Sequence, residues 1–285
     1  MEHLWKQNLR QIEPYVPGEQ SSDPDRIKLN ANENPYPPAP GVEAVLRSYD
    51  PAALCLYPDA NARLLKASIA RHYGVAPEQV FVGNGSDDVL ALAFQSFFNS
   101  DKPIAFPDIT YSFYPVWCRL FHIPFVTYPL TADFRMDPAD YAAPNGGVVL
   151  PNPNAPTSIG EDLPFVQALL DGNQDAVVII DEAYADFGGV SAVPLLADYP
   201  NLLVCGTFSK SRSLAGLRLG FAIGSAELIG VLEAVKNSYN SYTVDNLSLL
   251  CGAAAMDDEA YFAKTTAAVI TTRERVRRAL EQMGF

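Results

Sequence analysis

Short apolar runs alternate with longer amphipathic stretches along most of this 285-residue chain. Seven runs rich in Val, Ile, Leu and Phe predict strands: Gln79–Gly83, Pro103–Phe106, Pro124–Tyr128, Gly147–Leu150, Ala176–Asp181, Leu202–Thr207 and Arg218–Ile223. Several of these runs are almost continuously apolar, which is typical of strands that are covered on both faces.

Helical periodicity fills the intervals between these runs. It predicts helices at Asp88–Phe98, Tyr114–Phe121, Leu163–Leu170, Ala226–Lys236, Asn246–Met256 and Glu259–Met283. Strands and helices in alternation predict an α/β fold, with a mostly parallel sheet flanked by helices. We expect one large domain over residues 41–245. Residues 1–40 are polar and rich in proline, which predicts an irregular N-terminal arm.

Composition narrows the classes of function. The net charge of −13 disfavours a nucleic-acid partner, because nucleic acids attract basic surfaces. The four cysteines lie far apart and the three histidines are scattered, so no metal site is expected. No apolar run approaches the roughly 20 residues that span a membrane, and the N-terminus lacks the apolar core of a signal peptide. A cytoplasmic location is therefore expected.

A turn rich in hydroxyl groups follows the predicted strand Leu202–Thr207. It reads TFSKS, with Lys210 as its lysine, and Arg218 comes eight residues later. A lysine amine can form a Schiff base with an aldehyde cofactor. Thr207, Ser209 and Arg218 could supply the donors that a cofactor phosphate needs. A surface loop with a solvated lysine is the alternative.

A second signal is a buried run that ends in a carboxylate. Asp181 closes the run and Tyr184 follows three residues later. Ligands of open α/β sheets bind at the carboxyl ends of the strands, where an aspartate could pair with a protonated pyridine nitrogen. Asp181 could instead cap the next helix.

Three weaker signals follow other predicted strands. Ser86 and Asp87 open a helix after a glycine turn, so their backbone N–H groups could bind phosphate. Tyr111 could stack on a cofactor ring, although an aromatic residue there is more often part of the core. Asn154 lies in a proline-rich turn that could present its amide to a ligand.

Together, in this order, these motifs resemble those of the fold-type I aminotransferases, which depend on pyridoxal 5′-phosphate (PLP). The resemblance covers essentially the whole chain. More narrowly, the chain resembles the histidinol-phosphate aminotransferase subfamily. The narrower match rests on IEPYVPG (12–18), LNANENP (29–35) and LYPD (56–59), and is reinforced by GNGSD (83–87) and SLAGLRLG (213–220). The motifs around Asp181 and Lys210 carry the resemblance to the wider family. The implied fold is the large domain of aspartate aminotransferase with an incomplete small α/β domain at 246–285.

The resemblance implies a role for each matching residue. Lys210 would hold PLP covalently and later move a proton, Asp181 would pair with the ring nitrogen, and Tyr184 would bond the 3′ oxygen. Tyr111 would stack on the ring. The groups around the phosphate would be Ser86, Asp87, Thr207, Ser209 and Arg218. Tyr57 would reach the phosphate of a neighbouring subunit's cofactor, so a homodimer is implied.

The sequence departs from the family pattern in two places. The family's turn reads Asn-Pro-Thr-Gly, whereas Ala155 precedes Pro156 here, so Asn154 is expected to replace the usual asparagine. The family also continues with strands that carry an arginine for the substrate's anionic end, and this sequence stops at Phe285. We therefore expect a fragment or a naturally truncated protein.

The implied reaction moves an amino group between histidinol phosphate and 2-oxoglutarate, in histidine biosynthesis. The partners would be a small-molecule amino donor and a keto acid. Three alternatives share the motifs: another type I aminotransferase that uses aromatic amino acids, a decarboxylase of an amino-acid phosphate, and an inactive PLP-binding protein.

Overall fold

The computed structural model describes residues 3–19, 22–23, 25–142 and 144–285. Across these residues, seven strands form one sheet in the order β1-β7-β6-β5-β4-β2-β3. Their bounds are β1 Val80–Gly83, β2 Ile104–Pro107, β3 Phe125–Tyr128, β4 Gly147–Pro151, β5 Val178–Asp181, β6 Leu202–Thr207 and β7 Gly220–Gly224. All seven predicted strands are confirmed, with ends that differ by at most two residues.

The sheet is mostly parallel, as predicted. Only β7 runs against its neighbours β1 and β6, and the remaining neighbours pair in parallel. The α/β class is therefore confirmed. The domain boundaries at residues 41 and 245 stay predictions.

In the part of the chain that the structure describes, the α-helices comprise six that the periodicity predicts and two that it misses. Their bounds are α1 Pro40–Ser48, α2 Arg63–Tyr73, α3 Ser86–Phe97, α4 Phe113–Phe121, α5 Leu163–Asp171, α6 Ala226–Tyr239, α7 Asn246–Asp257 and α8 Glu259–Gln282. Short 3₁₀ helices lie at Leu4–Asn8, Pro51–Cys55, Pro77–Gln79, Pro138–Tyr141, Ala185–Phe187, Val193–Ala197 and Ala215–Leu217. The missed helices are α1 and α2.

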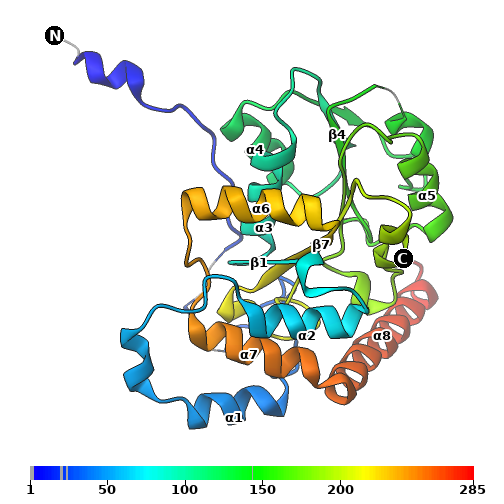
Figure 1. The fold of residues 1–285 in the computed structure, drawn as a ribbon. Helices are drawn as coiled ribbons and strands as arrows, with labels where there is room; N and C mark the ends of the chain where they lie inside the picture. The colour runs from blue at the N-terminus through cyan, green and yellow to red at the C-terminus, as the bar shows by residue number, and fades with distance from the viewer. Residues whose placement is uncertain (1–2, 20–21, 24, 143) are drawn as a thin grey trace.

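Helices cover both faces of the sheet (Figure 1). Ile179 of β5 packs into a buried cluster shared with α3, α4 and α6. Val178 and Ile180, which point to the other face, belong to a second cluster with α2, α5 and α7. Burial on two faces explains why the strands read as nearly continuous apolar runs.

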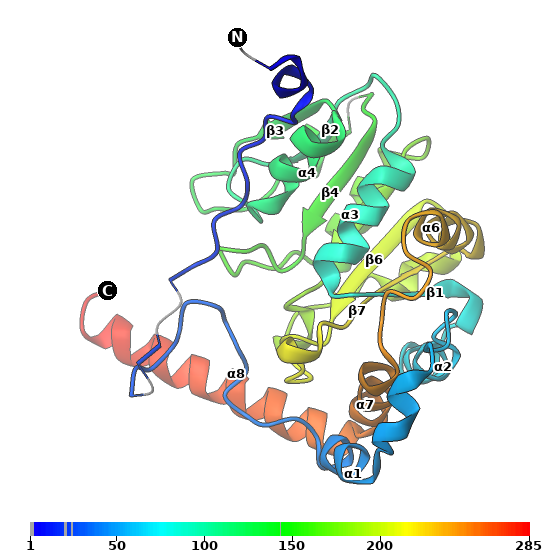
Figure 2. The same cartoon turned by 90° about the vertical axis from the view of Figure 1, so that its left-hand side faces the viewer.

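The N-terminal arm and α8 lie outside these layers. Figure 2 shows the arm running beside α8 on its way to α1. Along its 24 residues, α8 buries only Thr265 and Thr266. No helix in the described ranges is long and apolar enough to cross a membrane.

Candidate active site

The candidate site lies at one edge of the sheet, where several strand ends meet. β4 ends at Pro151, which pairs with Asp181 at the end of β5, and β6 ends beside them at Thr207. Because β7 is antiparallel, its first residue, Gly220, pairs with Thr207, which places Arg218 at the same edge. This edge is where parallel α/β sheets bind ligands.

A cavity at this edge, here called the inner cavity, collects most of the predicted site residues. Its lining includes nine of them: Ser86, Asp87, Tyr111, Asp181, Tyr184, Thr207, Ser209, Lys210 and Arg218. The side chains come from segments far apart in the sequence, and the sheet brings them together. Asn154 lines an adjoining cavity, described below, and Tyr57 lines neither.

Asp181 is a buried carboxylate at one end of the inner cavity. The Tyr114 hydroxyl donates a 2.8 Å hydrogen bond to Oδ2, and the Ala183 N–H donates one of 3.2 Å to Oδ1. Burial raises the pKa of Asp181 to about 6, and the bond from Tyr114 opposes part of that rise. A cationic group in the cavity would favour the charged carboxylate. The sequence had given no role to Tyr114.

The other end of the inner cavity is suited to an anion. Helix α3 begins at Ser86, and no side chain caps its first N–H groups. Arg218 Nη1 lies 3.5 Å from Ser209 Oγ, and Thr207 lines the same cavity. Gly85 has φ +91°, and a Cβ built there would lie 2.6 Å from Arg218 Nη2. Glycine therefore lets the guanidinium approach the helix start.

The Asp87 side chain bonds to two other residues that line the inner cavity. Its Oδ1 accepts a 2.8 Å hydrogen bond from the Tyr111 hydroxyl, and its Oδ2 accepts one of 3.3 Å from Arg218 Nη2. Burial, together with the nearby Asp87 charge, raises the pKa of Tyr111 far above its ordinary value. Tyr111 is therefore a neutral donor, and Asp87 fixes its ring at the cavity wall.

Lys210 is held by the N-terminal arm. Its Nζ donates to the carbonyl oxygens of Ala31, at 2.9 Å, and Asn32, at 3.3 Å, and lies 5.5 Å from the centre of the Tyr184 ring. The Asn34 side chain donates a 2.9 Å hydrogen bond to the Lys210 carbonyl. The amine is thus oriented beside Tyr184, and no carboxylate of the described residues pairs with it.

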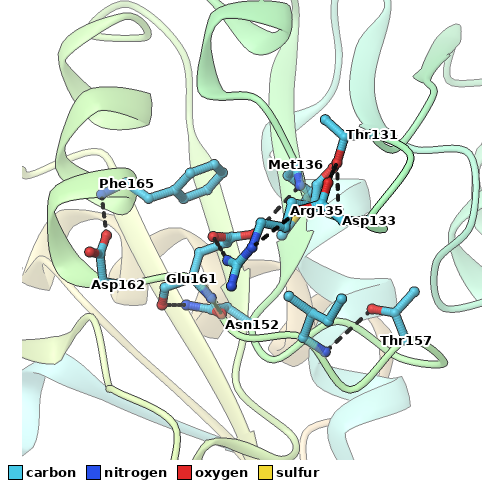
Figure 3. Close-up of polar contacts among 10 residues, drawn as sticks. Thr131, Asp133, Arg135, Met136, Asn152, Thr157, Glu161, Asp162 and Phe165 are labelled. Atoms are coloured by element: carbon cyan, nitrogen blue, oxygen red, sulfur yellow. Dashed lines mark hydrogen bonds and ion pairs between the residues drawn. The ribbon is translucent and has the colours of Figure 1, made fainter.

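Asn154 belongs to a turn that is fixed from both sides. Figure 3 shows Asn152 facing the backbone of Glu161, with which it exchanges hydrogen bonds of 2.8 and 3.0 Å, while Arg135 pairs with the Glu161 carboxylate. Asn154 is buried, and its Nδ2 donates to the Ile109 carbonyl. Its Oδ1 is buried and has no hydrogen-bond partner among the described residues. An unpaired buried amide oxygen has capacity for a ligand.

The comparisons with known proteins bear on what this site holds. The family model for aminotransferase class I and II matches residues 24–285. The chain belongs to the class I and II aminotransferase family. A protein of Chromohalobacter salexigens named histidinol-phosphate aminotransferase is 55% identical over 285 residues, which are the whole of this chain and 81% of that relative.

Solved aminotransferase structures share the fold. The histidinol-phosphate aminotransferase of Sinorhizobium meliloti, solved with pyridoxal-5′-phosphate, superposes with a TM-score of 0.76 at 26% identity. The match covers 87% of this chain and 69% of that one. The aspartate aminotransferase of Thermus thermophilus gives a TM-score of 0.77 at 20% identity over 89% and 71% of the two chains. The aspartate-aminotransferase-like fold is confirmed.

Aminotransferases use PLP, and the site of this aminotransferase fits that cofactor. PLP is held by a lysine, and its pyridinium nitrogen takes an acidic partner or an arginine. The inner cavity offers the Lys210 amine and the buried Asp181 carboxylate. At its other end, the uncapped start of α3 and the Arg218 guanidinium suit a phosphate.

Tyr57 lies away from the inner cavity of this aminotransferase. Its side chain is 81% exposed, and its ring stacks on that of Tyr242 at 4.6 Å between centroids. Its predicted role concerns the cofactor of a second subunit.

A second cavity, here called the outer cavity, adjoins the first and has a volume of about 350 Å³. Lys210, Tyr184, Pro153 and Ala155 line both cavities. The other residues lining the outer cavity are Asn32, Glu33, Asn34, Pro35, Asn154, Pro156, Ser158, Phe187, Val269 and Arg273. The volume lies in the range of small-molecule sites. The sequence analysis assigns no role to Val269 or Arg273 of α8, because it predicts only a helix there.

Proposed function

We propose that this aminotransferase moves an amino group between histidinol phosphate and 2-oxoglutarate, as a step of histidine biosynthesis, with PLP as its cofactor. The observation that carries the proposal is the 55% identity to a histidinol-phosphate aminotransferase over all 285 residues. The site agrees with it, because the residues of the inner cavity suit PLP and the outer cavity leaves room for a substrate beside Lys210.

The residues would hold the cofactor at its two ends. When bound, PLP supplies a carbonyl that takes up amino groups and a ring that accepts electrons from the substrate carbon. The Asp181 carboxylate would bind the ring nitrogen, and the Tyr184 hydroxyl and the Asn154 amide would bind the ring oxygen. Tyr111 would stack on the ring. The phosphate would be bound by Ser86, Asp87, Thr207, Ser209 and Arg218.

Lys210 would both anchor the cofactor and carry the proton. Its Nζ donates hydrogen bonds to the carbonyls of Ala31 and Asn32. These two bonds require the N–H groups of the free amine. Binding to the cofactor would release Nζ from this pair. The amine, once free beside the substrate, would carry the proton between the substrate Cα and the cofactor carbon that bears the amino group. A base fixed at a strand end gains rate through its proximity.

The proposal includes a homodimer in the cytoplasm. Tyr57 is exposed together with Leu54 and Leu56, so this loop is available to a second subunit. Tyr57 would then contribute its hydroxyl to the partner's cofactor phosphate. A cytoplasmic location is in keeping with an enzyme that acts on small soluble metabolites.

A substrate assay tests the proposal. The purified chain, loaded with PLP, is mixed in separate reactions with histidinol phosphate, phenylalanine and tyrosine, each with 2-oxoglutarate. We expect glutamate to form fastest from histidinol phosphate. Faster transfer from an aromatic amino acid, or release of CO₂ without glutamate, would contradict the proposed substrate and reaction.

A further inference from the structure

Lys236 is a lysine on the buried face of a helix. The buried residues of α6 are Ile229, Leu232 and Lys236, which have the spacing of an apolar helical stripe. An apolar side chain is the usual occupant of such a position, because burial of an ammonium group costs free energy unless the group is paired and hydrogen-bonded. The partners of Lys236 therefore show what this lysine stabilises.

The Lys236 amine contacts one carboxylate and one backbone carbonyl. Its Nζ lies 2.9 Å from Glu233 Oε2 and donates a 2.7 Å hydrogen bond to the carbonyl oxygen of Ala60. Glu233 has a second cation, since Lys66 Nζ lies 2.6 Å from its Oε1. Because Lys66 already balances the charge of this carboxylate, the distinct contribution of Lys236 is its bond to Ala60.

Ala60 belongs to the loop that carries Tyr57. This loop joins α1 to α2, and Figure 1 shows it beside the chain that leaves α6. The ring of Tyr57 stacks on that of Tyr242, which follows α6, with 4.6 Å between centroids. The end of α6 and the chain after it thus hold the loop at two points, Tyr57 and Ala60.

Tyr57 depends on these two contacts for its direction. The side chain is 81% exposed, and within the described ranges no hydrogen bond fixes it. Its position is therefore set by the stack on Tyr242 and by the backbone that Lys236 holds. A group that is held in place before it meets its ligand loses less conformational freedom on binding.

We propose that Lys236 and Tyr242 are positioning residues for Tyr57, and that they direct its hydroxyl to the cofactor phosphate of a second copy of this chain. The inference rests on the proposed function, which supplies the homodimer and the role of Tyr57. Lys236 itself would touch neither the cofactor nor the substrate. The lysine of one subunit would instead set the PLP affinity of the other subunit.

A double-mutant cycle on PLP affinity separates positioning from general stability. Fluorescence titration with PLP compares the unaltered protein with Lys236→Met, Tyr57→Phe and the protein that carries both changes. Lys66→Met is the matched control, because it removes the other cation of Glu233 and leaves the bond between Lys236 and Ala60 in place.

We expect Tyr57→Phe to weaken PLP binding about tenfold, the loss of one hydrogen bond to a charged group. Lys236→Met should weaken it about fivefold, because the stack on Tyr242 still holds part of the loop. In the Tyr57→Phe background Lys236→Met should cause no further loss, and Lys66→Met should leave PLP affinity within about twofold of the unaltered protein.

Hybrid dimers test whether the effect crosses between subunits. One hybrid joins a Lys236→Met subunit to a Lys210→Ala subunit, so the one site that can bind PLP through lysine receives Tyr57 from the subunit with intact Lys236. We expect that site to bind PLP as tightly as the unaltered protein does. In the second hybrid the Lys210→Ala subunit also carries Lys236→Met, and its unaltered partner's site should lose affinity about fivefold. Absorbance of lysine-bound PLP reports on this site alone.

Three results would overturn the inference and leave the proposed substrate and reaction intact. The first is a PLP affinity that Tyr57→Phe lowers and Lys236→Met does not. The second is a set of losses that add in the double variant, and the third is a loss that follows the altered subunit's own site in the hybrids. If Lys236→Met does not fold, Tyr242→Ala, at a half-exposed position, takes its place in every arm, and an unchanged PLP affinity overturns the inference. If Tyr57→Phe has no effect, the proposed role of Tyr57 fails, and the inference fails with it.

Discussion

The inner and outer cavities are built in different ways. The walls of the inner cavity are strand ends and a helix start, and its polar groups are bonded to one another, as Tyr114 is to Asp181 and Tyr111 to Asp87. The outer cavity is bounded by the arm, a proline turn and α8, and the Arg273 side chain that lines it is about half exposed. One cavity is fixed by the sheet, and the other by irregular segments.

This difference indicates which substitutions would disturb each cavity. A change among the strand ends would disturb several bonded groups at once, because the sheet register sets them together. A change in the arm or on α8 would alter one wall of the outer cavity and leave the sheet intact. We therefore expect cofactor chemistry to depend on the inner cavity and substrate choice on the outer one.

The largest expected effect is that of Lys210→Ala. Removing the amine takes away both the proposed anchor and the proposed proton carrier, so the transamination rate should fall by a factor of about 10⁴ or more. The measurement is glutamate formation from histidinol phosphate, with Lys264→Ala, an exposed lysine on α8, as the control. A rate loss of less than tenfold would show that Lys210 takes no part in the reaction.

Asp181→Asn should lower kcat by roughly 10²–10³, because it removes the buried charge that is proposed to stabilise the ring in the transition state. It should also change the pH dependence of cofactor binding. The pKa of Asp181 without the cofactor is about 6, and a cationic ring favours the carboxylate. Affinity should therefore weaken as pH falls through about 6, by up to about tenfold per unit for one linked proton.

The cofactor phosphate also titrates near pH 6, and it does so with the unaltered protein and with Asp181→Asn alike. The difference between the pH profiles of PLP affinity for these two proteins therefore reports on the Asp181 carboxylate. Fluorescence titration of PLP at pH 5, 6 and 7.5 gives the two profiles. Parallel profiles would show that Asp181 does not face the ring nitrogen.

Arg218→Ala should weaken PLP binding about tenfold or somewhat more, because the proposed guanidinium contact to phosphate is lost at a partly exposed position. Dissociation of PLP during dialysis provides the measurement, and Arg277→Ala is the control on an exposed helix face. Unchanged retention of PLP would place the phosphate elsewhere.

The smallest expected effect is on the arm. Asn34→Ala removes the hydrogen bonds that Nδ2 donates to the carbonyls of Lys210 and Ser211 and the one that Oδ1 accepts from the Tyr36 N–H, and should lower the free energy of unfolding by about 1 kcal/mol. Asn30→Ala, in the exposed part of the arm, is the control. Urea denaturation compares them. Equal unfolding free energies for the two variants would mean that the arm does not brace the Lys210 turn.

The sequence could predict the inner cavity better than the outer one for a physical reason. Apolar runs mark buried strands, and polar residues just after them must meet at the carboxyl edge, so nine predicted residues share one cavity. Tyr114 was not predicted as a site residue, because a tyrosine in an apolar helix is typical of the core. Its hydroxyl nevertheless donates a hydrogen bond to Asp181.

The missed features carry little signal in the sequence. Helix α2 is rich in charged residues, and the residue before it, Ala62, has φ +48° and offers no capping side chain. The carbonyls of Ala31 and Asn32 that hold Lys210 are backbone atoms, which every residue has. Arg273 is one of several arginines on α8, and only the packing of α8 against the turn at Phe187 distinguishes it.

The central claim is that Lys210 holds PLP within reach of histidinol phosphate. The most direct measurement is the absorbance spectrum of the purified chain with PLP, recorded before and after histidinol phosphate is added, beside Lys210→Ala. We predict a band of lysine-bound cofactor that Lys210→Ala abolishes and that histidinol phosphate converts to the band of the aminated cofactor. A band that persists in Lys210→Ala, or one that histidinol phosphate leaves unchanged, would contradict the account.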